Sequence, residues 1–411
     1  MISQSPKGII ELGNINVKCL IFKINEDNTS DILSTSIIKS EGMHNGVITN
    51  LNKATKTIRS CISIAENEAK ISLKTINVII EQPEFLCTKL SKDRKIDGSK
   101  IQKTDIEFLL KEAKKQVSYN DEKQSIIHIF NHNYIVDGKT FIEEPINVYA
   151  DYLSHEMTFI SMPKNNIKNI NQAFNECDIE VERLISCTFA LGAKLLNNNE
   201  LQLGSVLINV DSEMLSLGMF KNLALVHSLT IPIGVNHISK DISKVCSLNI
   251  SESENIRDKI DYSFQNNLKL FDNNNNLKDV YFSSSKFRKI SKPLIYKIIK
   301  SRLDEIFEIL KKQFIIAGFD PIAGTNVMLV GEGAHLYNLD KYCSEFFETN
   351  IKILGEGDLK DKRKYIDKNF APCLGALKII KDGWETEAIP KISNKYGKKR
   401  GFFNKLFGYG S

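Results

Sequence analysis

The chain has 411 residues, of which 42% are hydrophobic and 26% are charged. This composition is typical of a globular protein with a large core, and it excludes a wholly disordered chain. No apolar stretch approaches the ~20 residues that a membrane-spanning helix needs, so any contact with a membrane is expected to be peripheral. Residues 385–411 carry +4 of the net charge of +5. A basic segment behind a nearly neutral body predicts an anionic partner, either a membrane surface or a nucleic acid.

The eight cysteines show neither metal-like nor redox-like spacing, and no signal peptide precedes them. This pattern predicts reduced, buried thiols in a cytosolic protein. His128 and His132 are four residues apart, a spacing that could hold a metal on a helix. Their neighbours predict a strand and a turn instead, so we expect neither a metal site nor catalytic residues. The chain also lacks a G-x-S-x-G elbow and a G-x-x-x-x-G-K phosphate loop.

The first half of the chain alternates strand-like and helix-like segments. It opens with a strand–turn–strand pattern around Gly13-Asn14, since apolar and polar residues alternate on both sides. Arg183–Leu196 has the apolar density of a buried helix. A helix is predicted behind Thr104, which with Glu107 forms a capping box, and Ile106, Leu109, Leu110 and Ala113 mark its face. The other predicted elements are a helix over 50–69, strands over 77–80, 126–130, 134–136 and 158–162, and a helix over 167–177.

The second half repeats the opening pattern. Val206–Phe220 again predicts strand, turn and strand, so each half contains one hairpin of the type that cradles phosphates. A polar, non-periodic stretch from Glu385 to Lys395 predicts a linker. Between them we expect helices over 236–247, 251–264 and 294–317, a strand over 327–330 and a buried helix over 371–380.

The last fourteen residues have the pattern of an interfacial helix. At ~100° per residue, the large apolar side chains fall within an arc of about 140°, and positive charge surrounds them. Such a short segment should bind anionic lipid weakly, and several of them on one polymer should bind much more tightly. A tail folded back on the body, or a tail bound to nucleic acid, are the alternatives; we expect no nucleic-acid partner because the body has no basic groove. The membrane-binding residues are Lys398, Lys399, Arg400, Phe402, Phe403, Lys405, Leu406 and Phe407.

Several motifs together resemble one protein family. The two hairpins, the turn at Gly331 and the closing helix at Gly375 resemble the fold shared by actin, chaperone and sugar-kinase ATPases. Ser40–Leu51 is similar to the segment S-R-G-M-x-x-G-x-(V/I)-x-(D/N)-(L/I) of the FtsA family, and Ile231–Gly234 to its I-P-x-G turn. A linker followed by a short amphipathic helix is also typical of FtsA. The chain therefore resembles the FtsA family over nearly its whole length.

The resemblance implies an α/β, actin-like ATPase fold with two lobes. An FtsA-type extra subdomain, called IC, would replace the usual actin insert. The implied subdomains are IA (1–82 and 163–195), IC (83–162), IIA (196–230 and 305–384) and IIB (231–304), followed by the linker (385–397) and the membrane-targeting helix (398–411).

The implied nucleotide site departs from the family pattern. The second phosphate loop of the family reads D-(I/L)-G-G-G-T, whereas Asn209–Met214 has no glycine and places two acids where phosphates would lie. Glycines let backbone N–H groups approach phosphates, and acids repel them. Two interpretations stay open: ATP with magnesium bound weakly through the adenosine side, or no nucleotide at all. ATP hydrolysis is not expected, and the implied contact residues are Glu11, Gly13, Asn14, Asn16, Asn209, Asp211, Glu254, Arg257, Gly331 and Gly333.

The resemblance also implies partners and a place in the cell. The chain would be a non-enzymatic scaffold at the division site, on the cytoplasmic side of the inner membrane. It would bind the C-terminal peptide of the ring protein FtsZ, with Lys297, Lys300 and Arg302 as candidate contacts. It would form filaments with itself and recruit late division proteins through subdomain IC. The alternatives are another actin-like scaffold, such as the pilus protein PilM, and an active ATPase of the same fold.

Overall fold

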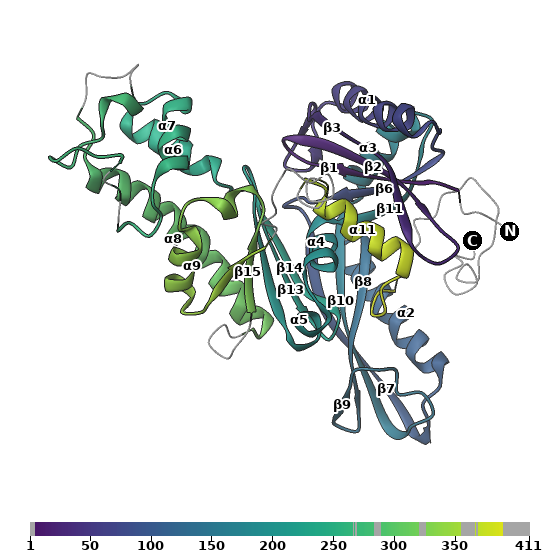
Figure 1. Ribbon diagram of the computed structural model, residues 1–411. Coiled ribbons are helices and arrows are strands. Elements are labelled where there is room, and N and C mark those ends of the chain that lie inside the picture. Colours follow the sequence, from purple (N-terminus) through teal and green to yellow (C-terminus); the bar gives the residue numbers. More distant parts are fainter. Residues whose placement is uncertain are drawn as a thin grey trace. The chain divides into compact units, whose positions relative to one another are not determined.

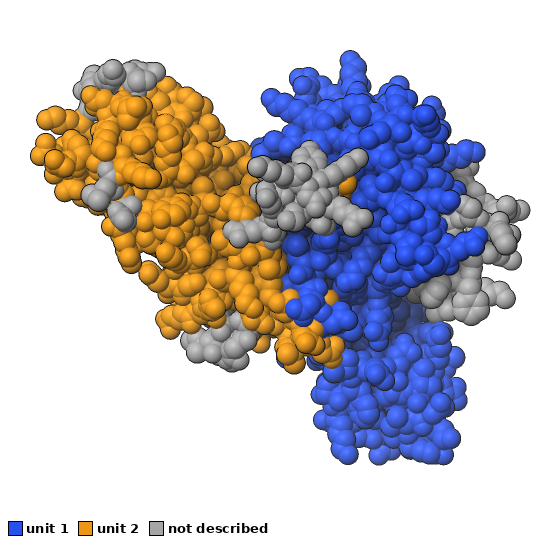
Figure 2. Space-filling view, viewed as in Figure 1, with its two compact units in different colours: residues 1–198, 221–226, 369–411 blue, residues 199–220, 227–368 orange. Residues whose placement is uncertain are grey.

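The computed structural model describes residues 5–265, 267, 269–282, 289–319, 326–354, 366 and 369–388. The chain divides into two compact units, which Figure 2 colours blue and orange. Unit 1 contains residues 1–198, 221–226 and 369–411, and unit 2 contains residues 199–220 and 227–368.

Unit 1 is built on a five-stranded sheet with the order β11-β6-β1-β2-β3. The predicted opening hairpin is present: β1 and β2 are antiparallel, while β6 pairs with β1 in parallel. Helices α1 and α3 pack together beside one face, and α4 and α11 pack together beside the other (Figure 1). The strands are β1 (Lys7–Leu12), β2 (Asn16–Ile24), β3 (Ser30–Lys39), β6 (Thr75–Ile80) and β11 (Glu180–Ser186), and the helices are α1 (Leu51–Ala69), α3 (Lys164–Asn175), α4 (Cys187–Leu195) and α11 (Ala371–Asp382).

The structure differs from the sequence prediction at two places in unit 1. The helix expected over 183–196 is a strand, β11, followed by α4, because an apolar run reads alike for a buried strand and a buried helix. Helix α11 lies in unit 1, whereas the sequence placed 305–384 with subdomain IIA. The reason is the packing of α11 on α4 and β1: a methyl group added at Gly375 would lie 1.8 Å from the carbonyl oxygen of Ala190.

A second sheet in unit 1 has the order β7-β10-β8-β9, and all its pairs are antiparallel. Helix α2 packs on this sheet through Ile106, Leu109 and Leu110, which join two apolar clusters with side chains of the strands. The sheet and α2 thus share apolar clusters of their own within unit 1. The elements are β7 (Leu86–Lys100), α2 (Lys103–Asn120), β8 (Gln124–Val136), β9 (Lys139–Phe141) and β10 (Tyr149–Pro163); a separate small hairpin joins β4 (Met43–His44) and β5 (Val47–Ile48).

Unit 2 repeats the pairing scheme of unit 1. Its sheet has the order β14-β13-β12-β15-β16, with an antiparallel hairpin (β12, β13) next to parallel strands (β12, β15, β16). The predicted repeat of the hairpin is therefore present. The strands are β12 (Ser205–Val210), β13 (Leu215–Lys221), β14 (Ala224–Ile231), β15 (Asn326–Val330) and β16 (Ile351–Ile353), and the helices are α5 (Asn198–Leu203), α6 (Asn236–Cys246), α7 (Ile250–Lys259), α8 (Lys292–Ala317) and α9 (Leu339–Phe347), with short 3₁₀ turns at Asp279–Tyr281 and Glu332–His335.

None of the helices in the described ranges is both long and apolar enough to cross a membrane. All eight cysteines lie within those ranges, and none of them forms a disulfide bond.

Candidate functional site

The turn between β1 and β2 contains the first group of predicted contact residues. Gly13 is required there, because a methyl group at this position would lie 2.6 Å from the carbonyl oxygen of Asn16. Behind the turn, Glu11 pairs with Lys18 across the hairpin at 3.4 Å. Burial opposes the charge on Lys18, but the Glu11 carboxylate outweighs it and raises the pKa of this lysine above its usual value. Sequence analysis missed Lys18, which the alternation of the strand would have placed opposite Glu11.

Asn14 in the same turn is held by the neighbouring loop rather than left open. Its side-chain amide donates to Asn45 Oδ1 at 3.2 Å, and its oxygen accepts from the backbone N–H of Gly46 at 3.2 Å. Gly46 continues the connection, since its carbonyl oxygen accepts from Gln82. The first loop is therefore a turn with one glycine whose Asn14 side chain is bonded to the neighbouring loop.

The turn between β12 and β13 corresponds to the second phosphate loop. The backbone N–H of Asp211 donates to the carbonyl oxygen of Met214, which closes the turn at 3.0 Å. Two backbone N–H groups at the start of α6 donate to this turn: Val235 to Asp211 O (3.1 Å) and Asn236 to Ser212 O (2.9 Å). These donors are thus committed to the chain's own carbonyl groups. Residues 211–214 also adopt no positive φ angle, the conformation for which phosphate loops use glycine.

Glu213 lies at the tip of this second turn and is held by two residues of α6. Its carboxylate accepts from the Asn236 side chain at 2.8 Å and from the Lys240 ammonium at 2.9 Å. Burial acts to raise the pKa of Glu213, but these two hydrogen bonds outweigh it and lower the pKa, so the carboxylate stays ionised. A negative charge of the protein therefore occupies the tip of the turn.

The residues expected on the adenosine side connect to the same network. Arg257 on α7 donates to Asn236 Oδ1 at 2.6 Å and also pairs with Asp258 at 2.7 Å. Asn236 thus bridges the acid of the second turn and the cation of α7, and sequence analysis did not identify it. Glu254 lies half-buried on the same helix.

The glycines of the third turn are packed against β12. A methyl group at Gly331 would lie 2.4 Å from Asn209 Oδ1, and one at Gly333 would lie 2.6 Å from Val210 Cγ1. Gly331 also has a φ angle of +90°, which favours glycine. Close packing therefore explains the presence of glycine at both positions without any ligand.

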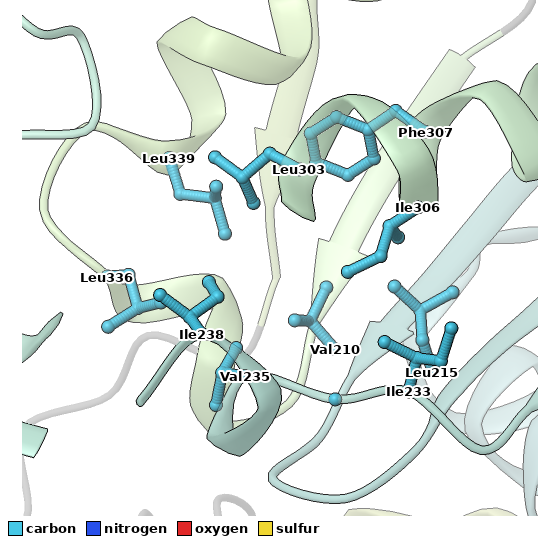
Figure 3. A pocket seen from close by; sticks show the side chains of 11 residues that line it. Val210, Leu215, Ile233, Val235, Ile238, Leu303, Ile306, Phe307, Leu336 and Leu339 are labelled. Carbon is cyan, nitrogen blue, oxygen red and sulfur yellow. The ribbon is translucent and has the colours of Figure 1, made fainter. Parts of the chain in front are cut away.

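A small cavity lies beneath these turns in unit 2 (Figure 3). Its volume is about 20 Å³, which is close to the space of one water molecule. Apolar side chains line it, among them Val210 and Leu215 of the hairpin and Leu303, Ile306 and Phe307 of α8. A nucleobase does not fit into this space, and the apolar lining favours a dry cavity.

The three cations proposed for peptide binding all lie on α8, but they differ in exposure and in their partners. Lys297 and Lys300 are exposed, and the Lys300 ammonium lies 4.8 Å from the centre of the Phe264 ring. Arg302 is already paired: it donates to both carboxylate oxygens of Asp241, at 2.7 and 3.1 Å, and to Glu305. Arg302 is therefore less available to an acidic peptide than the two lysines.

Two further sequence predictions concern residues elsewhere. His128 and His132 both lie on β8, and the described part of the chain contains no group of three or more side chains that could hold a metal ion. The membrane-binding residues Lys398, Lys399, Arg400, Phe402, Phe403, Lys405, Leu406 and Phe407 lie outside the described residues.

Comparisons with known proteins find similarity to FtsA. Residues 86–161, nearly the whole second sheet with α2, match the SHS2 domain inserted in FtsA. The chain is 22% identical over 355 residues to the cell division protein FtsA of Agrobacterium fabrum, covering 84% of this chain and 80% of that protein. It is also 22% identical over 411 residues to FtsA of Borreliella burgdorferi, covering 97% of both. The chain is therefore similar to FtsA over most of its length.

Solved structures confirm the predicted actin-like fold of this chain. The PilM–PilN type IV pilus biogenesis complex has a chain that matches with a TM-score of 0.59 at 10% identity, covering 90% of this chain and 98% of that one. MreB5 of Spiroplasma citri bound to AMPPNP matches with a TM-score of 0.51 at 15% identity, covering 93% and 98%. At these identities the likeness concerns the fold alone.

The fold family implies ATP with magnesium, and the turns of unit 2 do not fit it. A polyphosphate needs converging backbone N–H groups and positive charge. The second turn instead presents the Glu213 carboxylate, and the nearby N–H groups of Val235 and Asn236 are bonded to the turn itself. The acidic magnesium ligand of the family motif is the neutral Asn209, packed against Gly331.

Proposed function

We propose that this chain is a cell-division scaffold of the FtsA type. It would anchor the FtsZ ring to the cytoplasmic face of the inner membrane, assemble with copies of itself, and recruit later division proteins through its SHS2 subdomain. The similarity to FtsA over most of the chain supports the cell-division role. The basic, apolar sequence of residues 398–411 supports the membrane attachment.

The membrane proposal is tested by liposome co-sedimentation. The full chain is compared with a chain that ends at Lys395, on vesicles with and without anionic lipid. We expect only the full chain to pellet, and only with anionic vesicles, because the tail combines apolar side chains with positive charge. If both chains stay in solution, or both pellet equally, the anchor proposal is wrong.

We further propose that the scaffold works without nucleotide turnover. The network Lys240–Glu213–Asn236–Arg257 supports this, because it fills the second turn with the chain's own polar groups. Isothermal titration with ATP and magnesium should therefore show no binding at micromolar concentrations, and phosphate release should stay at the buffer rate. Tight binding in the titration would contradict the proposal.

The peptide contact would use the exposed lysines of α8. Acidic residues of the FtsZ C-terminal peptide would pair with Lys297 and Lys300, while Arg302 keeps Asp241. In a fluorescence-anisotropy titration, Lys300→Glu should weaken peptide binding about tenfold, and Lys311→Glu, further along the same helix, serves as the control. Equal weakening by both variants would indicate a non-specific charge effect and reject this contact.

A further inference from the structure

The segment directly after α11 forms a short additional strand. Glu387 pairs with Phe130 of β8 in an antiparallel bridge. The N–H of Asn131 donates to Thr386 O at 2.8 Å, and the N–H of Ala388 donates to Ile129 O at 2.9 Å. This part of β8 is an open edge, because β9 pairs only with Tyr134–Val136. The segment, yellow in Figure 1, therefore closes an edge of the SHS2 subdomain.

A buried acid holds this strand in place. The side chain of Glu387 is 1% exposed, and its carboxylate pairs with the Arg183 guanidinium and with His128 Nδ1 at 2.6 Å. The backbone N–H of Ser186 donates to His128 Nε2 at 2.9 Å. His128 must therefore carry its proton on Nδ1 and donate it to Glu387. The ring is neutral, and burial lowers its pKa.

Other residues of the segment make contacts as well. The indole N–H of Trp384 and the hydroxyl of Thr386 both donate to the carbonyl oxygen of Leu223, at 2.6 and 2.9 Å. The Trp384 ring packs edge-on against Phe189 with 5.2 Å between ring centres. Ala388 packs against the apolar cluster beneath α2. Backbone, buried charge and side-chain contacts thus hold Trp384, Thr386, Glu387 and Ala388, although the sequence pattern predicted a linker from Glu385.

We propose that Trp384–Ala388 is a strap that fixes the base of the C-terminal segment to the SHS2 subdomain, and that the His128–Glu387–Arg183 cluster is its lock. While the strap is closed, the connection to the tail starts at one defined point, after Ala388. When it opens, five more residues join the connection, which can then reach up to about 17 Å further. The use of the strap rests on the proposed membrane tail, but its existence does not.

Glu387→Gln is the variant that opens the lock. It keeps the size of the side chain but removes the charge, so Arg183 is left beside a neutral group in a buried site. Glu385→Gln is the matched control, since it removes the same charge two residues earlier, where the side chain is exposed. Trp384 is the only tryptophan of the chain, so its fluorescence reports on the strap alone.

Hydrogen exchange and fluorescence of the full chain test the proposal. In the parent protein we expect the amides of Asn131 and Ala388 to be protected and Trp384 to be poorly quenched by acrylamide. In Glu387→Gln both amides should exchange at least tenfold faster, together, while the amides between β7 and β10 keep their protection. Quenching of Trp384 should rise about twofold. Glu385→Gln should behave as the parent protein does.

Three results would overturn the strap. They are free exchange at Ala388 in the parent protein, parent-like exchange in Glu387→Gln, and faster exchange at Ala388 without a change at Asn131. If Glu387→Gln unfolds unit 1 as a whole, Ala388→Pro replaces it, because it removes the N–H that donates to Ile129 at the last strap position. The readouts for that variant are exchange at Asn131 and quenching of Trp384, since position 388 then has no amide hydrogen. Liposome pelleting of the same variants separates the two proposals. If the parent protein does not pellet with liposomes although its amides at Asn131 and Ala388 are protected from exchange, only the membrane-anchor proposal is contradicted.

Discussion

At the scale of single residues, a buried polar side chain in the SHS2 region affects the stability of the fold. His155 on β10 has 0% exposure and stacks on Tyr134 with 4.4 Å between ring centres. Neither of its ring nitrogens has a hydrogen-bond partner among the described residues. The ring is therefore held by packing alone, and burial of its two nitrogens without hydrogen bonds lowers the stability of the folded state.

The first prediction concerns the pH dependence of stability at His155. Burial, with a smaller contribution from His132, lowers the pKa of His155 from 6.5 to about 3. Below pH 6.5 the His155 ring is protonated in the unfolded chain but stays neutral in the folded chain. The contribution of His155 to stability is therefore fully present above pH 6.5 and is lost as the pH falls toward 3. Between pH 7 and pH 5 this group should cost about 2 kcal/mol of unfolding free energy.

His155→Phe keeps an aromatic ring against Tyr134 and removes the titrating group. Urea unfolding at pH 7 and pH 5 should therefore show a smaller loss of stability in this variant than in the parent protein. His44→Phe, at an exposed position on β4, serves as the control. An identical loss in His155→Phe and the parent protein would show that His155 does not contribute to the acid sensitivity.

At the scale of elements, the packing of unit 1 depends on the close contact between α4 and α11. Helices α4 and α11 cross so closely that only a glycine fits at position 375, where a methyl group would lie 1.8 Å from the Ala190 carbonyl oxygen. Backbone atoms of α4 cannot move without disturbing β11, the strand to which it is joined. The approach of α11 therefore depends on one missing side chain.

The second prediction follows from this crossing. Gly375→Ala should destabilise unit 1 by about 3 kcal/mol, at the upper end of overpacking effects, because the clash is with backbone. Gly318→Ala, just after α8, is the control: nothing lies within 4 Å of its added methyl group, and only its left-handed backbone (φ +72°, ψ +27°) opposes alanine. It should cost about 1 kcal/mol. Thermal unfolding compares the two, and equal losses would contradict the close crossing.

The same scale shows what the sequence could and could not predict. Both hairpins were predictable, because apolar alternation and a turn residue are local signals. Strand β7 was missed, since its lysines and other charged residues suit an exposed edge and hide the strand pattern. Strand β11 was read as part of a helix, and Glu387 as part of a linker, because their partners on β6 and β8 are distant in the sequence. The lack of glycine in Asn209–Met214 could be read from the sequence. The role of Asn236, which joins Glu213 to Arg257, required the fold.

At the scale of the whole molecule, the proposed membrane attachment and the proposed self-assembly should be linked. Burial of one large apolar side chain contributes at most roughly 1.5–3 kcal/mol, and each basic residue near an anionic leaflet about 1 kcal/mol. A short helix must be ordered at the same time, which offsets much of this gain. One tail should therefore bind reversibly. Tails gathered on one assembly raise each other's effective concentration, so that their combined affinity exceeds that of a single tail by a large factor.

The third prediction tests this linkage directly. Residues 385–411 fused to a monomeric carrier should bind anionic vesicles weakly and in simple proportion to concentration. The full chain should bind with a steep, sigmoidal dependence on its concentration, with at least a hundredfold higher apparent affinity once it self-associates. Replacing Phe402 and Phe407 by serine should abolish binding by both proteins, while raising the salt from 0.1 to 0.5 M should weaken both, because screening reduces the attraction of the basic residues. Equal affinities of carrier and full chain would show that the tail alone accounts for attachment and that assembly of the body adds nothing to it.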